Sequence, residues 1–321
     1  SPLTITKIGA GSPAMAAGVM AGERLVAIDG TMLVIPSVAI HMDRSVNQHK
    51  EWKVQKDMLP LYGMTGAKTP FMDVIAAAAK VKAEDILAHD LILYSRVPGT
   101  IWGEEREFIS SPKLDDLQCA FACFRGFTQG QKEKYISVYA LFDNEEVGSL
   151  TKQGADSTFL TDTVRRIASA LNIPEAEWLR KMPDSFMLSA DNAHAVHPNY
   201  TEKCDQTNRC YLNGGIVIKE AANQHYCTDA FSRAVFQAIC DDADVPTQAF
   251  ANKSDMAGGS TLGNLSNMQA SMHAVDVGLP QLAMHSSYET GGVRDVMYAI
   301  RALTAFYERN LTINGAESVE L

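Results

Sequence analysis

The chain has 321 residues, enough for one large domain or two ordinary ones and for a hydrophobic core without disulfides. Hydrophobic residues make up 46% and charged residues 21%, which excludes a disordered or collagen-like chain. The formal net charge is -10, which disfavours a nucleic-acid partner, and no apolar run reaches the roughly 18 residues of a membrane helix.

The predicted elements change in character near residue 67. Residues 1 to about 67 contain short β-branched runs and many glycines, which indicates a separate β-rich region. A helix is then predicted from Thr69, as N-cap, and Pro70, as first helical residue, to about His89. Residues 90–97 predict a strand.

Strands and helices alternate through the rest of the chain. A helix over 116–127, ended by Gly126 and Gly130, precedes an apolar run at 135–142 (YISVYALF) that predicts a buried strand. Further helices are predicted at 159–171, 228–243 and 292–310, and further strands at 185–190, 215–219 and 273–277. Alternation of this kind favours a layered α/β domain.

Carboxylates follow the predicted strands. The run 135–142 continues into residues 143–146 (DNEE), the strand 185–190 ends at Asp191, and the pair 115–116 (DD) begins a helix. A buried strand that ends in several carboxylates is costly unless a cation lies there. Ligand sites of open α/β sheets lie outside the carboxyl ends of the strands, so we expect these groups to gather.

Together with His285, these carboxylates form an oxygen and imidazole set that suits zinc, manganese or cobalt. A paired-metal site also needs a bridging carboxylate and a free one as base, and the adjacent Glu145 and Glu146 supply two different roles. Each feature alone has a structural explanation. Asp115 or Asp116 would be an N-cap, the two glutamates a solvated turn, and His285 a structural histidine.

The first residue is Ser1 and no signal peptide opens the chain, so we expect a processed, trimmed or mid-gene start. The six cysteines include no C-x-x-C pair, which favours reduced thiols and a cytoplasmic location. A disulfide between Cys204 and Cys210 remains an alternative.

Eight motifs in this chain resemble the aspartyl aminopeptidase family of dinuclear zinc aminopeptidases. They follow the family's order from about residue 17 to the C-terminal helix: IPSVAIHMDRSVN (35–47), QKDMLPLYG (55–63), KLDDLQCAF (113–121), FDNEEVGS (142–149), SADNAHAVHPNY (189–200), GGIVIK (214–219), GGSTLGN (258–264) and GLPQLAMHSSYET (278–290). The resemblance implies a three-layer α/β/α zinc-peptidase-like catalytic domain over 106–321. It also implies that residues 1–105 are the remnant of a β-rich inserted dimerisation domain, here incomplete.

The resemblance further implies a metalloaminopeptidase that removes N-terminal residues, including Asp or Glu, from peptides by means of a metal-activated water. Two Zn²⁺ ions, with Co²⁺ or Mn²⁺ as alternatives, would be bridged by Asp115. The other ligands would be Glu146, Asp191 and His285, and Glu145 would be the general base. Peptides would be the substrates, and the family's full-length members form homo-oligomers.

Substrate-side residues are also implied by the resemblance. Lys219 lies in a segment similar to the family's substrate pocket, where a lysine receives an acidic side chain, although a solvated lysine at a strand end is an equal alternative. His194 and His197 match positions close to the metals or to the substrate, and His197 is assigned to substrate binding.

The chain also departs from the family. A histidine of a short H-T-D motif, which the family carries ahead of Ser-Pro, has no match, and residues 3–16 match poorly. We therefore expect an N-terminally truncated member with one complete metal site and one weakened site. The alternative function is a catalytically impaired fragment or non-catalytic homologue that binds metal or peptide or acts in assembly. Residues 9–30 also resemble the core of a PDZ-type module.

Overall fold

The computed structural model of the chain describes residues 4–5, 26–27, 31–48, 50–130, 135–315 and 318–320. Its contacts divide the chain into two units, Ser1–Arg96 and Val97–Leu321, and each is treated by itself. The PDZ-like segment 9–30 lies outside the described residues, apart from 26–27. The predicted division into residues 1–105 and 106–321 stays a prediction.

The first unit contains a small antiparallel sheet and short helices. Its sheet has the order β2-β1-β3, from β1 (Thr4–Ile5), β2 (Val26–Ala27) and β3 (Leu91–Ile92). Helical turns lie at η1 (Arg44–Asn47), α2 (Val54–Asp57), α3 (Phe71–Ala79) and η2 (Ala83–Asp85). The predicted helix to His89 is too long, because Lys80 adopts a left-handed backbone with φ 57° and ends α3. The predicted strand 90–97 is limited to β3.

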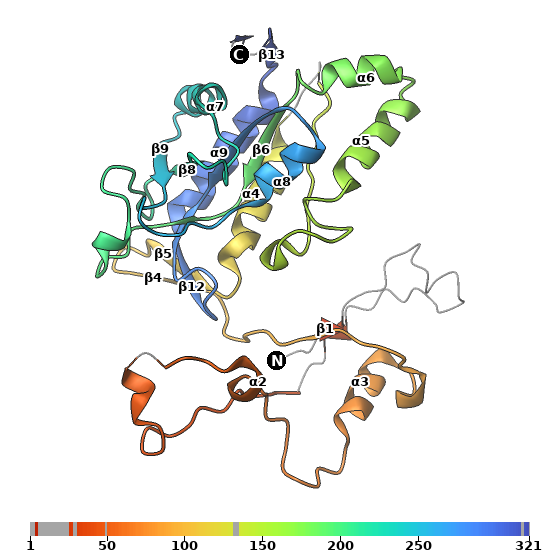
Figure 1. The fold of residues 1–321 in the computed structure, drawn as a ribbon, viewed down its shortest axis with the longest axis vertical. Coiled ribbons are helices and arrows are strands. Elements are labelled where there is room, and N and C mark those ends of the chain that lie inside the picture. Colours follow the sequence, from red (N-terminus) through yellow and green to blue (C-terminus); the bar gives the residue numbers. More distant parts are fainter. Residues whose placement is uncertain are drawn as a thin grey trace. The chain divides into compact units, whose positions relative to one another are not determined.

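The second unit is built on a four-stranded sheet with the order β6-β10-β8-β9, of which Figure 1 labels β6, β8 and β9. Its strands are β6 (Phe186–Ala190), β8 (Ile216–Glu220), β9 (Thr247–Ala251) and β10 (His273–Gly278). β10 runs parallel to β6 and antiparallel to β8, and β8 runs parallel to β9. The three strands predicted in this region are confirmed as β6, β8 and β10, whose β-branched residues suit a buried sheet.

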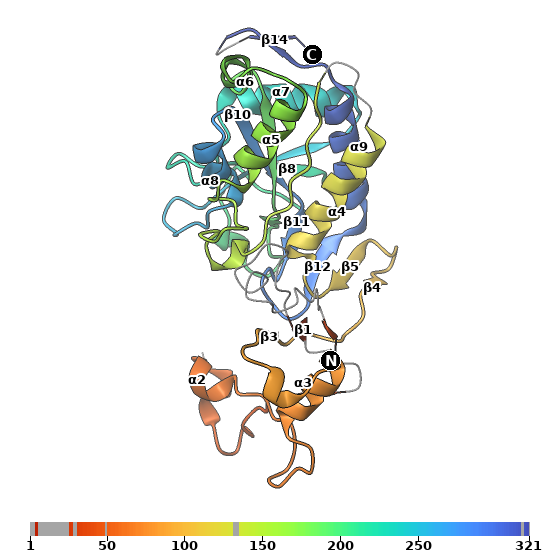
Figure 2. The same ribbon diagram turned by 90° about the vertical axis from the view of Figure 1, so that its right-hand side faces the viewer.

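Helices cover both faces of this sheet, as Figure 2 shows for β8 and β10. Ile216 and Ile218 of β8 face a core formed with α4, α7 and α9, whereas Val217 faces a second cluster on the opposite side. α8 packs on that opposite side, against Ser189 and Asp276. The predicted three-layer α/β/α class is therefore confirmed. The helices are α4 (Leu114–Gln129), α5 (Phe159–Ala170), α6 (Glu175–Lys181), α7 (Ala230–Asp242), α8 (Leu262–Gln269) and α9 (Val293–Glu308).

α4 and α9 pack closely because Gly126 lies at their contact. A Cβ atom built on Gly126 would lie 2.5 Å from the Cβ of Leu303, so no larger residue fits this approach. The prediction that Gly126 ends the helix is wrong, since α4 continues to Gln129.

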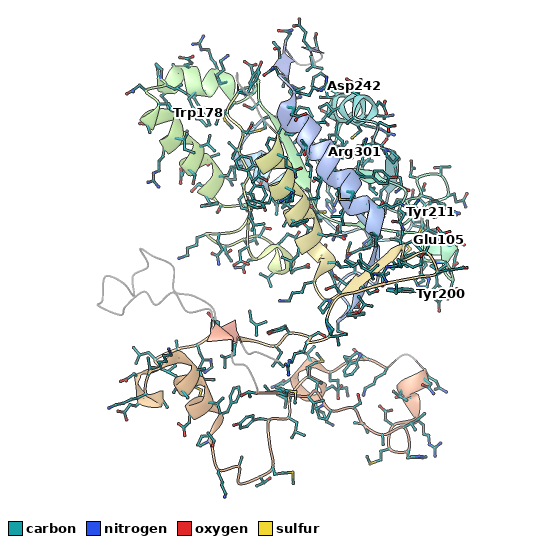
Figure 3. The ribbon with its side chains drawn as sticks, turned by 180° about the vertical axis from the view of Figure 1, so that it is seen from behind. Glu105, Trp178, Tyr200, Tyr211, Asp242 and Arg301 are labelled. Carbon is teal, nitrogen blue, oxygen red and sulfur yellow. The ribbon has the colours of Figure 1, made fainter. Side chains whose placement is uncertain are left out.

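On the other side of α9, Arg301 donates to the carbonyl oxygen of Ala243, 2.6 Å away, just beyond α7 (Figure 3).

A second sheet of the same unit carries the segments on which the candidate site is built. It has the order β4-β5-β12-β11-β7, from β4 (Thr100–Trp102), β5 (Phe108–Ser111), β7 (Ala193–His194), β11 (Pro280–Leu282) and β12 (Glu289–Gly292). The remaining strands, β13 (Thr312–Ile313) and β14 (Val319–Glu320), form a separate pair. No helix among the described residues is both long and apolar enough to cross a bilayer.

Residues 135–142 do not form the predicted buried strand. Within the described residues they belong to no strand, and the large side chains of Ile136 and Leu141 are 56% and 63% exposed. Side-chain contacts hold the segment instead: Tyr139 donates to the carbonyl of Ala120, and Tyr307 donates to the carbonyl of Val138. An apolar run forms a strand only where a neighbouring strand pairs with it.

Gly278 ends β10 where the backbone of Asp191 passes closest. A Cβ atom built on Gly278 would lie 1.9 Å from the Asp191 carbonyl oxygen. We expect Gly278→Ala to lower the free energy of unfolding by about 1–3 kcal/mol, because backbone must move to accommodate the methyl group. Urea unfolding measures this change. Gly259→Ala is the matched control, since no described residue other than its two chain neighbours comes within 4 Å of its built Cβ. Equal stability losses in both variants would contradict the packing argument.

Candidate metal centre

Three side chains from different loops meet at one end of the second unit. Asp115 follows β5 at the start of α4, Glu146 lies in the turn η3 (Glu145–Val147), and His285 follows β11. His285 Nε2 lies 3.0 Å from Asp115 Oδ2 and 3.2 Å from Glu146 Oε2. One ligand atom from each of the three residues falls within 4.8 Å of the others.

These distances fit a divalent cation. Two ligand atoms on a tetrahedral zinc ion, each bonded at about 2.0–2.1 Å, are roughly 3.3 Å apart. The two measured separations, 3.0 and 3.2 Å, are close to that value. A donor set of one imidazole and two carboxylates also matches the ligand types of zinc sites. The residues present therefore fit such an ion.

A second group shares Asp115. The carboxylates of Asp115, Asp116 and Asp191 also offer atoms within 4.8 Å of one another. Burial, and then the charges of Asp191 and Glu146, raise the pKa of Asp115 to about 7. Burial also raises the pKa of Asp116 well above its usual range, and its Oδ1 has no hydrogen-bond partner among the described residues. A cation would compensate these crowded carboxylates.

The members of the two groups, apart from Asp116, line one cavity of about 390 Å³. The side chains predicted from the sequence line it together, with the exception of His197: Asp115, Glu145, Glu146, Asp191, Lys219 and His285. His197 lies outside the lining and is exposed, with its ring centroid 5.1 Å from that of Tyr200. His194 of β7 does line the cavity, and burial lowers its pKa, which favours the neutral imidazole.

Glu145 lies in the cavity without belonging to either group of candidate ligands. Its side chain is half-buried, and burial, followed by the charges of Asp191 and Glu146, raises its pKa. The two adjacent glutamates therefore differ in surroundings, since Glu146 is 57% exposed. The strand expected before them is absent from the described residues, and both glutamates lie in the turn η3.

Lys219 is not a solvated lysine, because its side chain is only 2% exposed. Its Nζ donates to Asp191 Oδ2 and to the carbonyl of Asn192, at 3.2 Å each, and lies 5.2 Å from the ring centroid of Tyr226. Burial alone would lower the pKa of this ammonium, but the carboxylates of Asp191 and Asp276 outweigh it and raise the pKa. The lysine therefore brings a fixed positive charge to the cavity wall.

Two buried residues of this region, Asn192 and Glu289, were not found from the sequence. Asp116 was expected either as an N-cap or among the carboxylates that gather near a cation, and the cap is excluded because α4 has Lys113 at its N-cap and non-helical backbone at both aspartates. Asn192 donates to Asp115 Oδ1 at 3.3 Å and accepts from Gln118. Glu289 accepts hydrogen bonds from the backbone of two candidate ligands. The only sequence signal for Asn192 and Glu289 was their position inside motifs that also contain Asp191 and His285.

The chain is similar to known proteins. Residues 16–307 match the family described as aminopeptidase I zinc metalloprotease (M18). A probable M18 family aminopeptidase 2 of Clostridium novyi (strain NT) is 46% identical over 288 residues, covering 88% of this chain and 66% of the relative. Aspartyl aminopeptidase 4 of Saccharomyces cerevisiae is 34% identical over 331 residues, covering 91% of this chain and 68% of the relative.

A solved structure is also similar to this chain. The cryo-EM structure of the Ape4 and Nbr1 complex contains a chain that matches with a TM-score of 0.83 and 29% sequence identity, covering 96% of this chain and 62% of that one. The chain thus spans somewhat less than two thirds of the length of the first clostridial relatives that it matches, 66% of each.

Proposed function

Since this chain belongs to the M18 family of zinc metalloproteases, we propose that it functions as an aminopeptidase, which hydrolyses the first peptide bond of peptides. The observation that carries the proposal is the meeting of His285 with Asp115 and Glu146, at 3.0 and 3.2 Å, in a cavity that also contains Glu145. Candidate ligands and a separate carboxylate in one cavity are the parts that metal-assisted hydrolysis requires.

We propose that two Zn²⁺ ions are held here, with Co²⁺ or Mn²⁺ as substitutes. Asp115, the member common to both groups, would bridge the ions, Glu146 and His285 would hold one, and Asp191 would hold the other. When bound, the ions supply Lewis acidity, which polarises the scissile carbonyl and lowers the pKa of water. Buried Lys219, bonded to Asp191 Oδ2, would restrain the orientation of that carboxylate.

Glu145 would act as the general base. It takes a proton from the attacking water and later passes it to the leaving amine, so its carboxylate must be free of ligand duty. Its position on the cavity wall, outside both ligand groups, supports this role.

An acidic N-terminal residue is the proposed preference. Lys219 supports it, because a buried cation on the cavity wall favours a substrate carboxylate. His197 would contact the part of a peptide that extends beyond the cavity lining. The Lys219 assignment predicts a larger rate on aspartyl and glutamyl substrates than on leucyl ones.

A homo-oligomer in the cytoplasm is also proposed. Leu117, Phe121 and Phe124 on one face of α4 are 62%, 52% and 49% exposed, and an apolar face of this kind suits contact with another copy. Six free thiols support a reducing compartment.

The test combines metal analysis with a hydrolysis assay. After dialysis against trace zinc, elemental analysis is expected to find two ions per chain, of which the ion beside Asp191 is the more weakly held. Aminoacyl-anilides with aspartyl, glutamyl and leucyl groups are expected to be hydrolysed, with activity lost on chelation and restored by Zn²⁺. Folded protein that binds no zinc, or whose hydrolysis is indifferent to chelation, would overturn the proposal.

A further inference from the structure

Glu289, the first residue of β12, joins two candidate ligands that are far apart in the sequence. Its Oε1 accepts the backbone N–H of His285 at 2.7 Å, and its Oε2 accepts the backbone N–H of Asp115 at 2.9 Å. The side chain is buried, since the residue is only 2% exposed. Both oxygens of one buried carboxylate are therefore committed to the two residues whose side chains lie 3.0 Å apart.

The sheet explains how Glu289 reaches both segments. β12 pairs with β5 on one side, with Glu289 opposite Ser111, and with β11 on the other side, with Thr290 opposite Leu282. β5 leads to Asp115 and β11 leads to His285. Glu289 thus begins the strand that lies between the two strands that deliver the ligands.

The turn that carries His285 needs such a restraint. His285 has φ 65° and Ala283 has φ 57°, a left-handed backbone that residues with a Cβ atom rarely adopt. Such conformations persist where the surroundings fix them, and they gather at functional sites. The charge-assisted bond from the His285 N–H to Glu289 is a contact that fixes this turn.

We propose that Glu289 is a positioning residue, which clamps the backbone of Asp115 to that of His285 and so sets the spacing of the candidate ligands before a cation binds. The inference rests on the proposed function, because the spacing matters for an ion shared by these side chains. Groups that orient metal ligands typically change metal affinity by about 10- to 100-fold when they are removed.

The test is Co²⁺ binding, followed by visible absorption, to protein stripped with a chelator. Glu289→Gln keeps the size of the side chain but replaces one acceptor by a donor, so one of the two backbone bonds is lost. Glu289→Asp keeps the charge but is shorter by one methylene, so it cannot reach both N–H groups. Both variants are expected to bind Co²⁺ about 10- to 100-fold more weakly, with an altered absorption band. The aspartate variant separates lost positioning from lost charge.

Asp295 provides a matched control on the same chain. It is 1% exposed and also accepts two backbone N–H groups, from Asn213 at 2.6 Å and Gly215 at 3.0 Å, and neither partner belongs to the candidate ligand groups. Asp295→Asn is expected to lower the melting temperature as the Glu289 variants do, while its Co²⁺ affinity stays that of the parent.

Three results would overturn the clamp. The first is parent-like Co²⁺ affinity in Glu289→Asp. The second is equal weakening in Asp295→Asn, which would reduce Glu289 to a general stabilising residue. The third is a parent protein that binds neither Co²⁺ nor Zn²⁺, and this result alone would also overturn the proposed function.

Discussion

Glu145→Gln is expected to lower kcat by about 10²- to 10⁴-fold, the usual contribution of a general acid–base group. Glutamine has the size of glutamate but does not accept a proton at neutral pH. Because Glu145 lies on the cavity wall and outside both groups of candidate ligands, the bound metal is expected to remain. Anilide hydrolysis gives kcat, and elemental analysis of the same sample gives the metal content.

The neighbouring residue supplies the control. Glu146→Gln removes a carboxylate that lies 3.2 Å from His285 Nε2, so it is expected to lower both metal content and turnover. Both variants replace a glutamate by a glutamine at neighbouring positions, so they change charge and size equally. A Glu145→Gln protein with full turnover, or one that loses its metal as Glu146→Gln does, would show that the base is assigned to the wrong residue.

Asp115→Asn is expected to have the largest effect on metal binding, because Asp115 belongs to both groups. Its carboxylate is 4% exposed and lies at the junction of the two sets of ligands. An amide carries no charge and offers one good donor atom instead of two. We expect affinity for both ions to fall by more than about 100-fold, beyond the loss that outer groups cause, and hydrolysis to fall with it.

Isothermal titration of chelator-stripped protein with Zn²⁺ measures this change. Asp205→Asn serves as the control, since Asp205 lies outside the cavity lining and, among the described residues, its carboxylate accepts only from Thr207 and Asn208. One ion retained at parent affinity in Asp115→Asn would exclude the shared role and leave two separate sites.

The sequence predicted the second unit better than the first. The strands at 185–190 and 273–277 and the helix at 292–310 follow from long apolar patterns, and all three appear within a few residues of their expected bounds. The helix predicted from Thr69 was too long, because the left-handed backbone at Lys80 ends it. A lysine does not indicate this conformation in the sequence as a glycine does. The strand predicted over 135–142 was wrong, because strand pairing depends on the neighbouring strands and not on the segment itself.

In the candidate site, too, the sequence predicted some residues and missed others. Asp115, Glu146, Asp191 and His285 were selected by residue type and motif, and the structure places all four on one cavity. Asn192 and Glu289 escaped notice because their contribution lies in hydrogen bonds to backbone or side-chain atoms up to 174 positions away. Local patterns do not contain such contacts, whereas the fold makes them visible.

With the proposed ions bound at Asp115 and Asp191, the stability of the folded state would also report the concentration of free metal around it. A cation that binds only the folded chain adds RT ln(1 + [M]/Kd) to its stability, about 2.7 kcal/mol at a free concentration of 100 Kd. The protein would thus melt at a temperature set by the buffer's free zinc. Removal of free zinc from the buffer would therefore lower the melting temperature and make the chain more susceptible to proteolysis.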